Sequence, residues 1–120
     1  MKNDNVLHLK SKKFAIRIIN TFKYLQSTKK EFVLSKQMLR SGTAIGALIK
    51  ESEFAQSKKD FLNKLYIALK EANETQYWLE LLFETKYITK TEFDSLSNDC
   101  VELLKLLVAI TKTLKENLGN

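Results

Sequence analysis

The sequence of 120 residues contains no proline and only three glycines, Gly42, Gly46 and Gly119. Proline and glycine are the residues that most often shape tight turns and interrupt helices. Sheet proteins with many turns use both freely, so their scarcity argues against a β-sandwich or a β-barrel. It favours long helices joined by short loops.

Cysteine and histidine occur once each, as Cys100 and His8. One cysteine cannot form an intramolecular disulfide, and this pair cannot supply a typical zinc site. No Glu-x-x-His pair of the kind used in di-iron bundles is present, and neither is a glycine-rich phosphate loop. His8 lies in a polar amino-terminal segment, and Cys100 lies on the inward row of a predicted helix, where cysteine is usually an inert hydrophobe. We therefore expect no catalytic residues, no metal and no cofactor, and the protein is predicted not to be an enzyme.

Long apolar runs are also missing. No stretch approaches the about 20 apolar residues that a membrane-spanning helix requires, and the opening MKNDNVLHLKSKK is polar and charged. Together with the single cysteine, this predicts a soluble cytoplasmic protein without a membrane partner.

Acidic residues are scarce in the first half of the chain. Residues 1–50 hold eleven Lys or Arg and two acids, a net charge of +9, whereas residues 51–120 carry −3. Such asymmetry is typical of contact with nucleic acid or an acidic protein, although solvated lysines also occur simply because they keep small proteins soluble. Lysine suits phosphate contact without base reading. The candidate nucleic-acid-binding residues are Lys10, Lys12, Lys13, Arg17, Lys23, Lys29, Lys30 and Lys36.

Apolar residues recur at helical spacing in four segments. This periodicity predicts helices over about 9–26, 32–55, 58–84 and 90–117, with residues 1–8 frayed. Ser57 with Asp60, and Thr89 with Glu92, have the spacing of capping boxes at the starts of the last two helices. Short loops make successive helices antiparallel, so residues 1–120 are predicted to form one domain, an all-α antiparallel up-down-up-down four-helix bundle.

Small residues gather in the middle of the second predicted helix. Gly42 and Gly46 each cost about 1 kcal/mol relative to alanine inside a helix. We expect the close approach of another helix to offset this cost.

The third and fourth predicted helices carry a second apolar row beside the core row. This surplus predicts contact with another subunit, but it is also explained by the wide edges of an ordinary core stripe. The rows comprise Leu62, Tyr66, Leu69 and Trp78 on the third helix, and Val101, Leu104, Val108 and Thr111 on the fourth.

Three charged residues form a possible polar cluster. Arg40 and Glu51 lie three helical turns apart on one face, and Glu74 lies mid-way along the next helix. Antiparallel packing can bring Glu74 close to one of them. The result is either an inter-helix ion pair that fixes register or a binding site for a polar ligand.

Two segments carry a family resemblance: QMLRSGTAIGALIKESE at residues 37–53 and KDFLNKLYIALKEANETQYWL at residues 59–79. They resemble the 23S rRNA intervening-sequence proteins, although Ala47 and Ser52 stand where that family commonly has Asn and Gly. The residues that match the family motif are Gln37, Arg40, Ser41, Ile45, Glu51, Phe61, Ile67, Ala68 and Glu74.

The resemblance implies a four-helix bundle that assembles into a homopentamer with a basic surface. The accessory variability protein of diversity-generating retroelements is similar in fold and binds nucleic acid and a reverse transcriptase. We therefore expect a non-catalytic oligomer whose partners are itself, RNA or DNA, and a reverse transcriptase or other protein. The alternative is a protein–protein adaptor or scaffold for an acidic protein partner.

Overall fold

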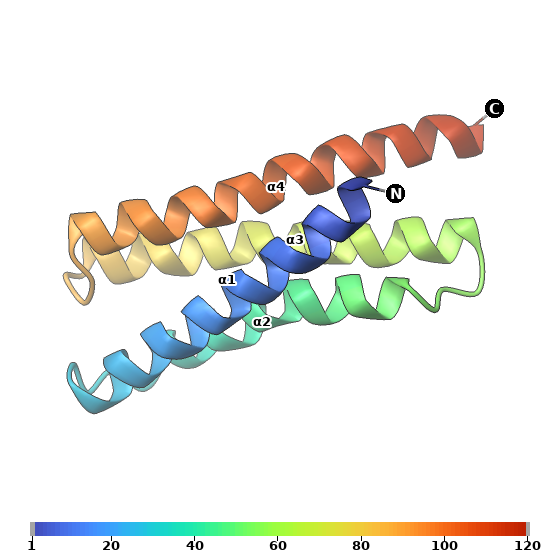
Figure 1. Cartoon of the computed structure of the whole chain (residues 1–120). Coiled ribbons are helices and arrows are strands. Elements are labelled where there is room, and N and C mark those ends of the chain that lie inside the picture. Colours follow the sequence, from blue (N-terminus) through green and yellow to red (C-terminus); the bar gives the residue numbers. More distant parts are fainter. Residues whose placement is uncertain (1, 120) are drawn as a thin grey trace.

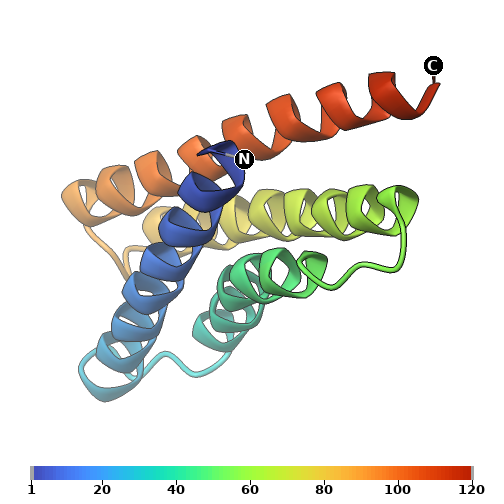
Figure 2. The same cartoon turned by 45° about the vertical axis from the view of Figure 1, so that its right-hand side comes forward.

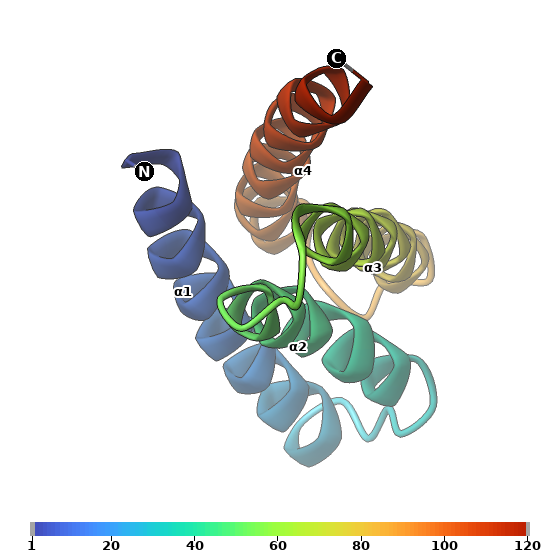
Figure 3. The ribbon, with the colours of Figure 1, turned by 90° about the vertical axis from the view of Figure 1, so that its right-hand side faces the viewer.

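Four helices account for nearly all of the structure. The computed structural model describes residues 2–119, with side chains from residue 5 onward, and contains α1 (Lys2–Ser27), α2 (Leu34–Ser52), α3 (Lys58–Glu84) and α4 (Lys90–Gly119). Successive helices run in opposite directions (Figure 1) and follow one another around a common core (Figure 3). The predicted all-α four-helix bundle is confirmed. No described helix is both long and apolar enough to cross a membrane.

The first helix begins earlier than the sequence analysis predicts. α1 is helical from Lys2, so the expectation that residues 1–8 fray is wrong for residues 2–8, while Met1 lies outside the described residues. Leu7 explains the difference, because it is 1% exposed and lies two helical turns before the buried Phe14. The core row of α1 therefore extends toward the amino terminus and stabilises the first turns.

Helices α3 and α4 begin where their capping boxes predict. The Ser57 hydroxyl accepts a hydrogen bond from the Asp60 amide at 3.0 Å. At α4 the exchange is reciprocal: Thr89 Oγ1 accepts from the Glu92 amide at 3.1 Å, and Glu92 Oε1 accepts from the Thr89 amide at 2.9 Å. These contacts satisfy amides that have no partner within the helix.

Helix α2 is shorter than predicted and begins at a cap that the sequence analysis missed. The Glu31 carboxylate accepts hydrogen bonds from the amides of Val33, Leu34 and Ser35 at 3.1, 3.0 and 2.6 Å. Burial alone would raise the pKa of Glu31, but these amides and the Ser35 side chain outweigh burial and lower the pKa. At the other end, the Ser52 hydroxyl donates to the Ile49 carbonyl at 2.6 Å.

The two glycines of α2 lie against α1. A Cβ atom added at Gly42 would come within 2.9 Å of two Ile18 side-chain carbons, and one added at Gly46 would lie 3.4 Å from the Ser11 carbonyl oxygen. The predicted close approach of a second helix is therefore confirmed, with α1 as the neighbour.

The second apolar rows of α3 and α4 are largely covered within the chain. Leu62 and Thr111 are buried, and five further members of the rows are half-buried. Val108 is the exception, at 51% exposed. Larger exposures occur elsewhere, at Leu9 on α1 and at Phe54 after α2.

Candidate nucleic-acid interface

The eight predicted basic residues lie along α1, in the loop that follows it and in the first turn of α2. The α1 residues do not share one face, because Lys12 lines a groove with α2, whereas Lys10 and Lys13 line a hollow with α4. The loop that carries Lys29 and Lys30 lies at the end of the bundle where α1 ends and α2 begins (Figure 1). Seven of the eight residues are exposed and Arg17 is half-buried. Their surroundings divide them into two groups.

Arg17 and Lys10 join α1 to α4. The Arg17 guanidinium donates to Asp99 Oδ2 at 2.6 Å, to Ser95 Oγ at 2.8 Å and to the Ser95 carbonyl at 3.2 Å. Lys10 forms an ion pair with Glu102. Carboxylates of α4 neutralise both positive charges. Arg17 and Lys10 are therefore better suited to holding α1 against α4 than to contacting phosphate.

The other six predicted residues lack the ion pairs that hold Arg17 and Lys10, although Lys13 lines a small hollow with Asp99 and Glu102. No ion pair joins any of them to another residue in the described part of the chain, and all are exposed. They are Lys12, Lys13, Lys23, Lys29, Lys30 and Lys36. An exposed, uncompensated ammonium group is what non-specific phosphate contact requires.

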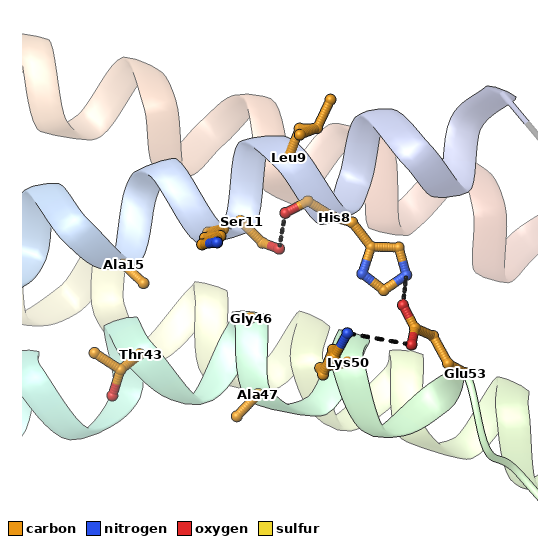
Figure 4. Close-up of a pocket in the computed structure, with 10 residues that line it drawn as sticks. His8, Leu9, Ser11, Ala15, Thr43, Gly46, Ala47, Lys50 and Glu53 are labelled. Carbon is orange, nitrogen blue, oxygen red and sulfur yellow. Dashed lines mark hydrogen bonds and ion pairs between the residues drawn. The ribbon is translucent and has the colours of Figure 1, made fainter.

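A shallow groove of about 400 Å³ lies between α1 and α2. Figure 4 shows Ala15, Gly46 and Ala47 along it, and their small side chains leave the space open. At one end, Glu53 pairs with His8 Nε2 at 3.2 Å and with Lys50 Nζ at 3.5 Å (Figure 4).

Chemical groups for catalysis are not assembled in this groove. Among the described side chains that line it, Glu53 is the one carboxylate and is engaged by two basic groups, and the hydroxyl of Ser11 donates to the His8 carbonyl at 3.1 Å. Across residues 5–119, no group of three or more His, Cys, Asp and Glu side chains is placed to hold a metal ion.

The predicted polar cluster forms between α2 and α3. Arg40 pairs with Glu71 at 3.0 Å and with Glu74, which also accepts from Trp78 Nε1 at 3.0 Å. Burial alone would lower the pKa of Arg40, but the two carboxylates outweigh burial and raise it. Of the two residues that Glu74 was expected to approach, it contacts Arg40, whereas Glu51 is exposed and forms no ion pair with a described residue. Glu71 was missed, although it lies one turn before Glu74 on the same helix face.

Comparison with known proteins identifies the family. The model of the 23S rRNA-intervening sequence protein family matches residues 3–109. The chain belongs to this family. A crystal structure described as a protein with unknown function from the S23 ribosomal protein family, from Bacteroides thetaiotaomicron VPI-5482, is 60% identical in sequence. The two structures have a TM-score of 0.91, and the match covers 92% of this chain and 98% of the other. A search of curated proteins finds no match.

No catalytic family is indicated by either comparison. In this 23S rRNA-intervening sequence family member, three of the nine motif residues are buried: Ile45 and Ala68 lie in the core, and Ser41 accepts a hydrogen bond from Thr75 at 2.8 Å. Phe61 is half-buried, while Gln37, Glu51 and Ile67 are exposed.

Cys100 has the structural role that its position predicts. Its Sγ is buried and donates to the Ala72 carbonyl at 3.2 Å. Burial, and to a lesser extent Asp99, raises the pKa of the thiol to about 12. The nucleophilic thiolate is therefore scarce at neutral pH.

Proposed function

We propose that this chain is a non-catalytic, oligomeric, cytoplasmic protein that binds RNA or other nucleic acid through a basic surface. The observation that carries the proposal is the set of six exposed lysines without ion pairs to described residues, Lys12, Lys13, Lys23, Lys29, Lys30 and Lys36. The family description, which refers to 23S rRNA, supports the same class of ligand.

Phosphate contact by lysines makes the binding affinity depend on salt concentration. Each ammonium that neutralises a phosphate releases a counterion, so affinity falls steeply as salt rises. Lysine lacks the forked geometry with which arginine recognises guanine, and the more capable Arg17 is held by α4. The proposed binding therefore depends on RNA charge and shape more than on sequence.

A filter-binding titration against a structured RNA at rising salt tests the proposal. Replacing Lys12, Lys13 and Lys23 of α1 by Gln is expected to weaken binding and to reduce the slope of log affinity against log salt by about 2.7 for duplex RNA. The matched control replaces Lys105, Lys112 and Lys115 of α4, which removes the same charge from another surface and is expected to change affinity much less. Absent or salt-independent binding contradicts the proposal.

Self-association is the second part of the proposal. It is supported by exposed apolar side chains that the chain itself does not cover, Leu9 at 71%, Ile16 at 51% and Val108 at 51%. Light scattering is expected to give a multiple of 13.9 kDa, five-fold for the pentamer implied by the resemblance. A 13.9 kDa particle would refute this part.

An adaptor that binds an acidic protein is the alternative function. Leu9 and Ile16 lie among the α1 lysines, and such a mixture of apolar and basic side chains also suits a protein partner. A pull-down from the host that retains an acidic partner after nuclease treatment would favour the adaptor, whereas loss of all partners would favour nucleic acid.

A further inference from the structure

Two loops distant in sequence meet at one end of the bundle. The α1–α2 loop, residues 28–33, and the α3–α4 loop, residues 85–89, lie at the same end in two views (Figures 1 and 2). Between them is a hollow of about 290 Å³, to which Lys29 contributes from one side and Lys86 and Lys90 from the other. None of the described residues that line this hollow is a carboxylate.

Three carboxylates near this end have partners of their own, whereas Glu84, the last residue of α3, is exposed and forms no ion pair with a described residue. Glu31 accepts the amides at the start of α2, and Glu92 accepts the Thr89 amide. Asp94 forms an exposed ion pair at 2.7 Å with Lys90, which lies one helical turn earlier on α4. Lys29 and Lys86 are exposed and form no ion pair with any described residue. Two ammonium groups at the hollow are thus available to an anion.

Aromatic side chains form another part of its wall. Phe83 and Tyr87 both line the hollow and are half-buried. Phe83 is fixed by a stack on Phe93, with ring centroids 4.9 Å apart and planes 19° apart. Cationic groups beside aromatic rings are the combination with which proteins hold single-stranded nucleic acid, because the rings stack on bases while the cations contact phosphates.

The backbone conformation at Lys86 is one in which lysine is less stable than glycine or asparagine. Lys86 has a φ of 68° at the residue that closes α3, where its amide donates to the Phe83 carbonyl and the Tyr87 amide donates to the Leu82 carbonyl. Glycine and asparagine adopt this left-handed conformation at much lower cost than lysine does. Lys30, with a φ of 55°, repeats the pattern in the other loop. The fold alone would favour other residues at both positions.

We infer that the loop end of the bundle binds an unpaired nucleotide of RNA. Lys29 and Lys86 contact the phosphate, and the base packs on the wall formed by Phe83 and Tyr87. This inference rests on the proposed nucleic-acid binding and deepens it, since the lysines of α1 contact phosphates of any RNA while the hollow selects single-stranded segments.

Fluorescence anisotropy with a labelled single-stranded oligouridylate and an RNA duplex of equal length tests the inference. The double variant Lys29→Gln/Lys86→Asn removes both charges, and asparagine suits the left-handed backbone. It is expected to melt at or above the temperature of the unmodified protein, yet to bind the single strand with a salt slope reduced by about 0.7, because one phosphate contact is lost. Tyr87→Leu, which keeps apolar bulk but removes the ring, is expected to weaken single-strand binding roughly five-fold or more and duplex binding much less.

The matched control is Lys12→Gln/Lys23→Gln, which removes two charges from α1. It is expected to weaken binding to both RNAs and to leave the ratio of single-strand to duplex affinity unchanged. If the unmodified protein binds neither RNA, the proposed function fails and this site fails with it. If the protein binds RNA but the loop-end variants bind the single strand as well as it does, the proposed function stands and this site is refuted.

Discussion

At the scale of single residues, two glycines of α2 face α1 under different constraints. Gly42 lies opposite Ile18, a fully buried β-branched side chain with little rotational freedom. Gly46 lies opposite the Ser11 backbone at a separation that an ordinary methyl contact tolerates. The same chemical change at the two positions therefore has opposite expected effects.

We predict that Gly42→Ala destabilises the protein and that Gly46→Ala does not. Alanine gains about 1 kcal/mol of helix propensity at either position. At Gly42 the new methyl would come within 2.9 Å of Ile18 carbons, and overpacking of this kind costs about 1 to 3 kcal/mol. Urea unfolding measures both variants. A Gly42→Ala variant more stable than Gly46→Ala would contradict the close packing of α1 on α2.

At the scale of an element, α2 starts on a carboxylate instead of an ordinary N-cap. Val33 occupies the N-cap position without a side-chain hydrogen bond, and Glu31, two residues earlier, accepts three amides of the loop and first turn. A negative charge at this end also interacts favourably with the helix dipole.

We predict that Glu31→Gln lowers the free energy of unfolding by about 1 to 2 kcal/mol at pH 7. Because the pKa of Glu31 is lowered in the folded state, its contribution is present above the ordinary value of 4.5 and is lost as pH falls through the folded pKa. The stability difference between the two proteins should therefore shrink as pH falls below 4.5 and through the lowered pKa of the folded state. The control is Glu51→Gln, an exposed carboxylate on the same helix. A pH-independent difference would show that the charge of Glu31 does not stabilise the start of α2.

At the scale of the whole molecule, α1 is inclined to α4 (Figure 2), and polar contacts connect the two helices. Arg17 reaches two side chains and a carbonyl of α4, so it joins the first and last helices across 82 residues of sequence. Most exposed ion pairs contribute little, but several hydrogen bonds from one guanidinium contribute more.

We predict that Arg17→Gln lowers the free energy of unfolding by about 1 kcal/mol and speeds hydrogen exchange at the amides of α1 more than at those of α3. Lys13→Gln serves as the control, because Lys13 lies on the same helix without an ion pair to a described residue. Equal effects of the two substitutions would show that Arg17 does not join the helices.

Features that depend on neighbours in sequence were predictable. The starts of α3 and α4 follow from capping boxes in which residues three apart exchange hydrogen bonds, and the core rows follow from helical periodicity. Local patterns failed where the local signal was weak. The polar residues around Leu7 gave no sign that it is buried. Glu31 lies two residues before the N-cap position, where a capping side chain is not expected.

The sequence by itself determined that the chain forms four helices around one core, that Cys100 lies inside, that another helix closely approaches the glycines of α2, and that the basic charge belongs to the first half. Only the tertiary structure decided which basic residues remain available. Arg17 and Lys10 meet Asp99 and Glu102 because α1 packs beside α4, and Lys29 meets Lys86 because two loops share one end of the bundle. Charge pairing depends on distance in space, and no local pattern encodes the distance between helices at opposite ends of the chain.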